Sequence, residues 1–307
     1  MKIIIPDRID LLGSTKDKIR ELGGEVYEDT PTDEATIVAR IKDAEIITAN
    51  YIDITASIID KAPNLKYIIV PAVGYEWVDY AYAKTKGIMT VNCPTFNSRA
   101  VAEHAIALMF TLKRKLVEAT ISMRSGKWNH EDYKGTETYG KKLGLMGYGR
   151  IAKQVEAMAR GLGMEVSHIN SSSSSEEIDV LLRSSDVICM CLPSNDSTKH
   201  ILDERRFGLM QPHSLLINVG RGTTVDQKVL VKTLQSGKIA GAGLDVFEGE
   251  PLTGVPPAGI TAIANLPNVV ATPHMAYNTE ETVKRLGEEL LQNIQASSAG
   301  RPVNVVN

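Results

Sequence analysis

Short runs of apolar residues alternate with amphipathic stretches from the first residue of this chain. Apolar runs of this length indicate buried strands, and apolar residues spaced three and four apart indicate helices. Over the first third, the pattern predicts strands at Lys2–Pro6, Gly24–Tyr27, Glu45–Thr48, Tyr67–Val70 and Ile88–Val91, and helices at Ser14–Leu22, Asp33–Ile41, Ala56–Lys61 and Val78–Lys86. This alternation is typical of a parallel α/β sheet.

A helical pattern from Asn97 to about Arg124 is too long for a crossover in a small unit, so it predicts the passage into a second domain. Two domains also suit a length of 307 residues. The second alternation predicts strands at Lys142–Met146, Glu165–Ile169, Asp186–Leu192, Ser214–Val219, Gly241–Asp245 and Val269–Ala271, and helices at Arg150–Leu162, Ile178–Ser184, Ser197–His200, Glu204–Leu209, Gln227–Ser236 and Glu280–Ser297. The pattern does not assign the tail, Pro302–Asn307, to either sheet.

Charge and composition exclude several classes of partner. With 34 basic and 37 acidic residues, the formal charge of −3 gives no reason to expect nucleic acid or an anionic membrane. No apolar run approaches the roughly 20 residues that a membrane span needs. The three cysteines, Cys93, Cys189 and Cys191, cannot form a disulfide framework, and we expect core positions rather than a metal site. A reducing cytoplasm is the expected location.

A glycine-rich turn follows the strand that ends at Met146. It reads Gly147-Tyr148-Gly149-Arg150-Ile151-Ala152 and opens a helix. Gly147 permits the tight turn, Gly149 lets the backbone approach a pyrophosphate, and Ala152 is small enough for close packing of helix on strand. The helix N-terminus then favours an anion. The turn predicts a dinucleotide-binding site.

The position that selects the adenosine ribose falls at Asn170, where such sites normally carry an acidic residue. An amide does not repel a 2′-phosphate, and Ser171–Ser175 supplies hydroxyl donors. No Arg or Lys follows, however, and Glu176 and Glu177 would oppose a phosphate. The balance favours use of either NAD or NADP.

Three ionisable residues fall where strands of the second alternation end: Arg221, Glu250 and His274. Ligands of open parallel sheets bind beyond the carboxyl ends of the strands, so all three are predicted to face one crevice. A carbonyl that accepts a hydride needs a proton, which His274 suits near neutral pH. Glu250 would orient the imidazole and favour its charged form, and Arg221 would bind the carboxylate and polarise the carbonyl of a 2-oxoacid.

With these residues assembled, the chain resembles the D-isomer-specific 2-hydroxyacid dehydrogenases over nearly its whole length. The motifs that carry the resemblance are Val73-Gly74-Tyr75, Asn97-Ser98, Val101-Ala102-Glu103-His104, the turn at Gly147–Ala152, Asn218-Val219-Gly220-Arg221-Gly222, Gly243-Leu244-Asp245-Val246-Phe247, Glu250-Pro251 and Thr272-Pro273-His274. The gaps of 29 residues from Arg221 to Glu250 and 24 from Glu250 to His274 are similar to the family's spacing.

The resemblance implies two doubly wound parallel-sheet domains, with a Rossmann cofactor domain at 98–276 inserted into a flavodoxin-like substrate domain at 1–97 plus 277–307. It also implies site residues. Val73 and Gly74 would hold the substrate carboxylate with Arg221, and Tyr51 would line the side-chain pocket. The cofactor residues implied are Gly147, Tyr148, Gly149, Arg150 and Ile151 at the pyrophosphate, Asn170, Leu192, Pro193 and Thr198 on the adenosine side, and Val219, Gly220 and Asp245 at the nicotinamide. Members are typically homodimers joined through the cofactor domains.

The chain also departs from the family pattern. Only fifteen residues lie between Asn170 and Asp186, so we predict that the strand following Asn170 is missing or vestigial. Glu250 argues against the formate dehydrogenase branch, and the segment after His274 resembles the lactate or 2-hydroxyisocaproate type. Two alternatives stay open: a dinucleotide-sensing binding protein on the same fold, and a phosphoglycerate-type dehydrogenase without a regulatory domain.

Overall fold

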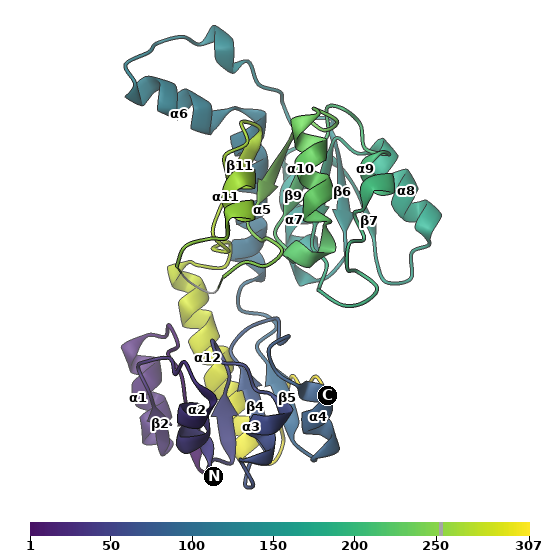
Figure 1. Cartoon of the computed structure of the whole chain (residues 1–307). Coiled ribbons are helices and arrows are strands. Elements are labelled where there is room, and N and C mark those ends of the chain that lie inside the picture. Colours follow the sequence, from purple (N-terminus) through teal and green to yellow (C-terminus); the bar gives the residue numbers. More distant parts are fainter. Residues whose placement is uncertain (252–253) are drawn as a thin grey trace. The chain divides into compact units, whose positions relative to one another are not determined.

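The computed structural model describes residues 1–251 and 254–307, and the chain forms two compact units. Unit 1 comprises Met1–Asn97 and Asn278–Asn307, and unit 2 comprises Ser98–Tyr277. Each unit has one parallel sheet with helices on both faces (Figure 1). The predicted α/β fold class is confirmed. Among the described helices, none is both long and apolar enough to cross a membrane.

Unit 1 contains a five-stranded sheet with the strand order β2-β1-β3-β4-β5, which is the flavodoxin-like order. Its strands are β1 (Ile3–Ile5), β2 (Gly24–Val26), β3 (Ile46–Thr48), β4 (Tyr67–Val70) and β5 (Met89–Asn92). Its helices are α1 (Gly13–Glu21), α2 (Glu34–Ile41), α3 (Ala56–Asp60), α4 (Tyr80–Thr85) and α12 (Glu280–Ser298). The central strands β1, β3 and β4 are buried throughout because both faces of the sheet are covered: α1 and α12 pack on one, and α2, α3 and α4 on the other.

The C-terminal tail joins unit 1, which the sequence pattern left unassigned. Val305 forms an antiparallel bridge with Val91, and the Val306 N–H donates to the Thr90 carbonyl oxygen. The tail therefore extends the sheet at the free edge of β5.

Unit 2 contains a six-stranded sheet with the order β11-β10-β9-β8-β6-β7. Its strands are β6 (Lys142–Met146), β7 (Glu165–Ile169), β8 (Val187–Met190), β9 (Leu215–Asn218), β10 (Gly241–Leu244) and β11 (Val269–Ala271). Its helices are α5 (Ser98–Lys113), α6 (Leu116–Arg124), α7 (Arg150–Gly161), α8 (Ser175–Ser184), α9 (Glu204–Phe207), α10 (Gln227–Gln235) and α11 (Ala258–Ala264), with 3-10 turns at Glu131–Tyr133 and Gly222–Thr224.

Helices α5 and α7 cover one face of this sheet, and α8 to α11 cover the other. After β7 the chain passes directly through α8 into β8, so no strand lies between residues 170 and 186, all of which are described. The prediction of a missing strand is confirmed, and β7 is the edge of the sheet.

The helices of the structure differ from the predicted ones at three places. The long helix over 97–124 is interrupted, because the Lys113 carbonyl oxygen accepts from Thr136 N–H and Lys115 adopts a left-handed φ of 49°. Ser197–His200 is a turn, in which the Asn195 side chain accepts two backbone N–H groups. Helix α11 was not predicted, since its seven residues bury only Ile260 and Ile263.

Asp7 lies at the point in unit 1 where the winding of the sheet reverses, between the ends of β1 and β3. Its side chain is fully buried, and Oδ2 accepts from the Tyr51 N–H at 2.6 Å and the Asn50 N–H at 3.3 Å. Oδ1 has no hydrogen-bond partner among the described residues. Burial raises the pKa of the Asp7 carboxyl from 3.8 to about 6 in spite of these bonds.

Asp7→Asn tests the raised pKa of the Asp7 carboxyl through the pH dependence of stability. A raised pKa means that the folded chain binds the proton more tightly, so the native protein loses stability as the pH rises from about 4 to about 6. The amide does not titrate, so the free energy of unfolding of Asp7→Asn relative to the native protein should rise by roughly 2 kcal/mol across that range. Denaturant titrations at several pH values measure this difference. The exposed Asp10→Asn is the matched control, and a pH-independent difference for Asp7→Asn would refute the assignment.

Candidate active site

The glycine-rich turn of unit 2 joins β6 to α7, and the fold itself requires its first glycine. Gly147 has a left-handed φ of 95°, and a Cβ there would lie 2.9 Å from the Cys191 carbonyl oxygen. Cys191 follows β8, the neighbour of β6 across the sheet. The turn therefore sits against the next strand where the winding of the sheet reverses, which is the ligand site of doubly wound sheets.

Gly149 presents the opposite case. Its φ of −89° suits any residue, and among the described residues nothing crowds the position of a Cβ. No described side chain caps the N-terminus of α7, and its first turn carries no acidic residue. The fold does not require glycine here, whereas close approach of a pyrophosphate does. The turn fits a dinucleotide.

The side chain of Tyr148 is held by other residues. Its hydroxyl donates to Glu156, and its ring stacks on His168 at 3.6 Å. The Glu156 carboxylate raises the pKa of Tyr148. Any contact of Tyr148 with a cofactor is therefore expected from its backbone.

Asn170 ends β7 and shapes the serine-rich loop. Its Oδ1 accepts from the backbone N–H of Ser172 at 2.8 Å and from the Ser172 hydroxyl at 2.6 Å. Ser174 and Glu177 then form a capping box that opens α8, which lowers the pKa of Glu177. Glu176 pairs with Arg183 at 3.2 Å. Glu176 and Glu177, which the sequence predicted to oppose a 2′-phosphate, therefore both have partners within the protein.

Arg221 follows β9, in a loop that packs closely on the segment after β10. A Cβ on Gly222 would lie 2.0 Å from the Phe247 carbonyl carbon, so the two backbones touch there. The Asn218 side chain fixes the loop by accepting from the Gly220 N–H and donating to the Arg221 carbonyl oxygen. This contact brings the Arg221 loop next to the segment that carries Glu250.

Glu250 and His274 form a hydrogen-bonded pair. Oε1 of Glu250 meets Nδ1 of His274 at 2.5 Å, and Oε2 accepts from the Phe247 N–H at 2.7 Å. Both carboxylate oxygens are therefore used, and the bond at Nδ1 fixes the orientation of the half-exposed ring. A cavity of about 320 Å³, with apolar walls that include Phe247 and Ile260, borders the pair.

His274 has a left-handed backbone, with a φ of 51°. Such a conformation costs a non-glycine residue of the order of 1 kcal/mol and persists only where the surroundings enforce it. Here Asp245 enforces it. Its backbone oxygen accepts from the His274 N–H, and its carboxylate, 1% exposed, accepts from the Met275 and Ala276 N–H groups and the Thr272 hydroxyl.

His104 supports the same loop from α5. Its Nε2 lies 3.0 Å from the Thr272 hydroxyl and 3.5 Å from the Asp245 carboxylate. The sequence pattern placed His104 in a family motif without a role and expected Asp245 only at the nicotinamide. Spacing alone could not show that both support the His274 loop.

The remaining predicted residues also follow strands. Leu192, after β8, lies beside both Gly147 and Gly220, and the Thr198 hydroxyl donates to the Pro193 carbonyl oxygen at 2.7 Å. In unit 1, Tyr51 follows β3 and Val73 follows β4, where Asn92 donates to the Val73 carbonyl oxygen. Gly74, next to Val73, is buried.

The strand order arranges the unit 2 residues along one edge of the sheet. From β11 to β7 the strand ends carry His274, then Asp245 and Glu250, then Arg221, Leu192, the glycine turn and Asn170. The three ionisable residues predicted to act on a substrate thus occupy one half of the edge, and the glycine turn occupies the other. Together they define an oxidoreductase that uses a nicotinamide dinucleotide.

Comparison with known proteins identifies the family. Residues 106–276 match the model of the D-isomer specific 2-hydroxyacid dehydrogenase NAD-binding domain. A glycerate dehydrogenase of Methylorubrum extorquens is 37% identical over 91% of this chain and 90% of its own. A solved acyclic imino acid reductase in complex with NADPH and D-Arg is 33% identical over all of both chains, with a TM-score of 0.91. A D-lactate dehydrogenase of Aquifex aeolicus, complexed with NAD and lactic acid, is 28% identical over 98% of this chain and 96% of its own, with a TM-score of 0.86. The chain belongs to the D-isomer specific 2-hydroxyacid dehydrogenase family.

Comparison of Gly149→Ala with Gly147→Ala tests whether the two glycines have different roles. No described residue lies within 4 Å of a Cβ at Gly149, so the melting temperature should change little. The methyl group would intrude on a close contact with the cofactor, and such overpacking costs roughly 1–3 kcal/mol, which weakens dinucleotide binding about ten- to hundredfold. Calorimetric titration with NADH and NADPH measures the change. Gly147→Ala should instead lower the melting temperature, and wild-type affinity in Gly149→Ala would show that the pyrophosphate binds elsewhere.

Proposed function

We propose that this protein transfers a hydride between NAD(P)H and a 2-oxoacid, giving a D-2-hydroxyacid. The observation that carries the proposal is the hydrogen-bonded Glu250–His274 pair, held on the same sheet edge as the dinucleotide turn. The D configuration follows from family membership. The reduced nicotinamide, when bound, supplies the hydride.

His274 is the acid in the direction of reduction. As negative charge develops on the carbonyl oxygen, the proton moves from Nε2 to that oxygen, and the imidazole becomes neutral. Glu250 holds Nδ1 and so orients the ring for the transfer. In the direction of oxidation His274 accepts the proton from the hydroxyl group.

Arg221 binds the carboxylate of the substrate and polarises its carbonyl group, because a guanidinium donates in a fixed fork. Within the same proposal, Val73 and Gly74 donate backbone N–H groups to that carboxylate, and Tyr51 contacts the substrate side chain. The cofactor residues proposed are Gly147, Tyr148, Gly149, Arg150 and Ile151 for the pyrophosphate, Asn170, Leu192, Pro193 and Thr198 for the adenosine, and Val219, Gly220 and Asp245 for the nicotinamide. Either NAD or NADP serves, since Asn170 is uncharged.

A second candidate substrate is an imine formed from a 2-oxoacid and an amine. It is favoured by the similarity to the solved acyclic imino acid reductase, which was bound to NADPH and D-Arg. In such an imine a nitrogen that carries the substituent of the amine replaces the carbonyl oxygen, and the carboxylate is kept. The same acid would deliver its proton to that nitrogen, and the same guanidinium would bind the carboxylate.

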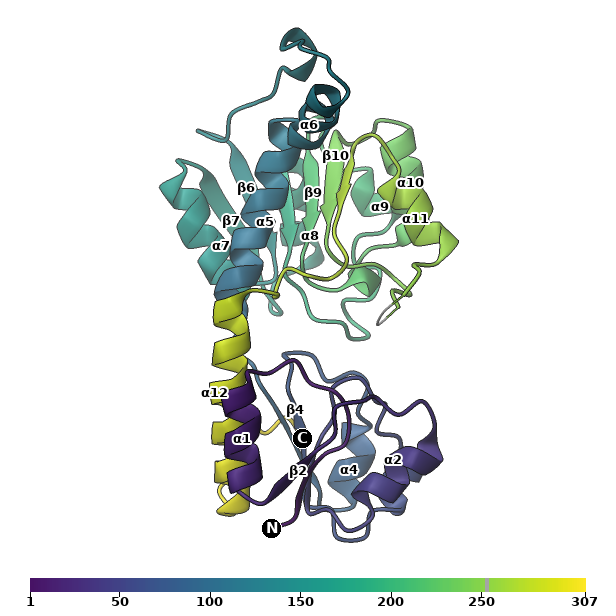
Figure 2. The same cartoon turned by 90° about the vertical axis from the view of Figure 1, so that its left-hand side faces the viewer.

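The protein is also proposed to be a homodimer. Helix α6 projects from unit 2 (Figure 1), as does the segment after it (Figure 2). Both expose large apolar side chains, which would be costly to leave in water. These are Leu116, Val117, Ile121, Met123 and Trp128, the last of which is 84% exposed. A second copy of this chain would cover them. Light scattering should give twice the chain mass, and Ile121→Glu should halve that mass.

The first test is oxidation of NADH and of NADPH, in parallel, with glyoxylate, hydroxypyruvate, pyruvate, phenylpyruvate and 2-oxoisocaproate. Each 2-oxoacid is assayed with and without ammonium or arginine. We expect turnover without an amine and a D-configured product on chiral chromatography. His274→Gln, which cannot supply the proton, should bind the cofactor normally and lose turnover.

Other outcomes of this assay are equally clear. Turnover that requires the amine would assign the enzyme to imines. Bound dinucleotide with no turnover of any substrate would favour the dinucleotide-sensing protein, and the proposed reaction would be wrong.

Glu250→Gln should slow reduction. The neutral amide lacks the carboxylate charge that strengthens the hydrogen bond to Nδ1, so it orients the His274 ring less firmly. The kcat for reduction should therefore fall, while the dissociation constant of the cofactor stays unchanged. Glu248→Gln is the matched control, because Glu248 lies two residues away and pairs with a different histidine, His200, at 3.1 Å. An unchanged kcat in Glu250→Gln would separate Glu250 from the acid.

A further inference from the structure

We propose that Arg206 is a positioning residue for the adenosine half of the dinucleotide. It ties together the two loops, at 170–175 and 193–201, to which that half is assigned above, so the inference rests on the proposed function. Arg206 belongs to the short helix α9 and lies in none of the motifs that carry the family resemblance.

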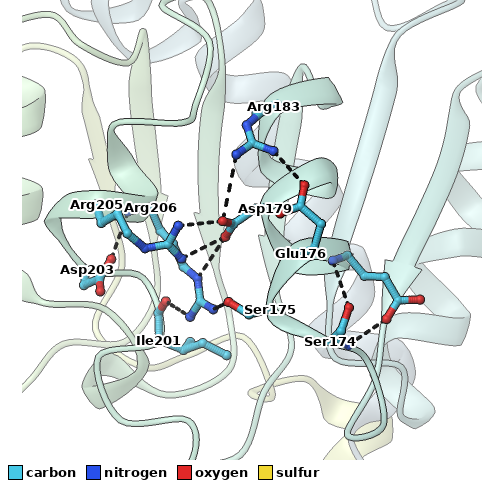
Figure 3. A network of polar contacts seen from close by, with 10 residues as sticks. Ser174, Ser175, Glu176, Asp179, Arg183, Ile201, Asp203, Arg205 and Arg206 are labelled. Carbon is cyan, nitrogen blue, oxygen red and sulfur yellow. Dashed lines mark hydrogen bonds and ion pairs between the residues drawn. The ribbon is translucent and has the colours of Figure 1, made fainter.

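Arg206 reaches two segments with its guanidinium: the end of the segment 193–201, at Ile201, and helix α8, whose first residue is Ser175 (Figure 3). Nη1 donates to the Ile201 carbonyl oxygen at 2.8 Å, and Nη2 donates to the Ser175 hydroxyl at 3.2 Å. Nε lies 3.5 Å from Asp179. The Arg206 side chain is only 13% exposed, and its contacts with Ile201 and Asp179 are partly buried, whereas its bond to Ser175 lies at the surface.

The two loops are each shaped from within, by the same device. In one loop the Asn170 side chain accepts from Ser172, and in the other the Asn195 side chain accepts from the N–H groups of Ser197 and Thr198. Such turns fix the path of each loop but not the distance between the loops. Arg206 bonds to the end of both, and therefore sets that distance.

The edge position of β7 makes this bond necessary. The loop at 170–175 follows the last strand of the described sheet, so no neighbouring strand confines it on the outer side. Its other attachments are its own turn and the capping box of α8. Loss of the Arg206 contact would let the loop move relative to the segment 193–201, and ordering it again on binding would weaken the affinity for the adenosine half.

Asp179 orients Arg206 without depending on it. This carboxylate, on α8, also accepts two bonds from Arg205, at 2.5 and 2.9 Å, which hold the pKa of Asp179 below its usual value. Arg183 lies 3.9 Å away. Asp179 therefore keeps charged partners when Arg206 is replaced, and Arg206→Gln should remain folded.

Arg205→Gln is a matched control. Arg205 is the adjacent residue, carries the same charge and binds the same Asp179, but none of its hydrogen bonds reaches either loop. The probes are ADP-ribose and its 2′-phosphate, because they contain the adenosine half and need no hydride transfer. Their dissociation constants are measured by calorimetry, together with KM and kcat for the reduced cofactor.

Arg206→Gln should weaken binding of both probes about tenfold, as expected for the loss of one or two charge-assisted hydrogen bonds, and raise the cofactor KM with little change in kcat. Arg205→Gln should stay within about twofold of the native protein. Arg206→Lys, which keeps the charge but not the fork, should resemble Arg206→Gln.

Native affinity in Arg206→Gln, or an equal loss in Arg205→Gln, would overturn the proposal. So would a native protein that does not bind ADP-ribose. A native protein that binds ADP-ribose and turns over no 2-oxoacid would refute the proposed reaction alone, and the comparison of Arg206 with Arg205 would still decide the role of Arg206.

Discussion

The parallel direction of every strand is the constraint on which the site depends. In a parallel sheet all the loops that follow strands emerge at one edge, so their order in space is the order of the strands and not of the sequence. Residues up to 127 positions apart, Gly147 and His274, thus lie on one edge of unit 2. The winding reverses between β6 and β8, and there the glycine turn rests on Cys191.

Two kinds of requirement fix the residues along this edge. Gly147 and Gly222 are glycine because neighbouring backbone leaves no room for a side chain. Gly149, by contrast, has room for a Cβ among the described residues, and the proposed close approach of a dinucleotide accounts for a glycine there. Asp245 belongs to both kinds, since its buried carboxylate supports a loop whose conformation serves the chemistry of His274.

The sequence predicted the structure correctly where a feature is determined by residues that lie close together in the chain. Strands of apolar residues, the strand–turn–helix at Gly147 and the short chain between Asn170 and Asp186 all have local signals, and the structure matches each of them. Arg206 has no such signal, because Ser175 lies 31 residues away and only packing of α9 beside α8 joins them. The break at Lys115 depends on the distant Thr136, and the tail at Val305 pairs with β5 across more than two hundred residues. Tertiary contacts of this kind decide structure without leaving a pattern in the chain.

The left-handed backbone of His274 has a consequence for how this chain tolerates change. Glycine adopts such a conformation most readily, whereas a histidine there depends on the support of Asp245. The residue that gives the greatest stability at this position is therefore not the one that the proposed reaction uses as its acid. Under the proposed function, His274 occupies a position where activity and stability oppose each other.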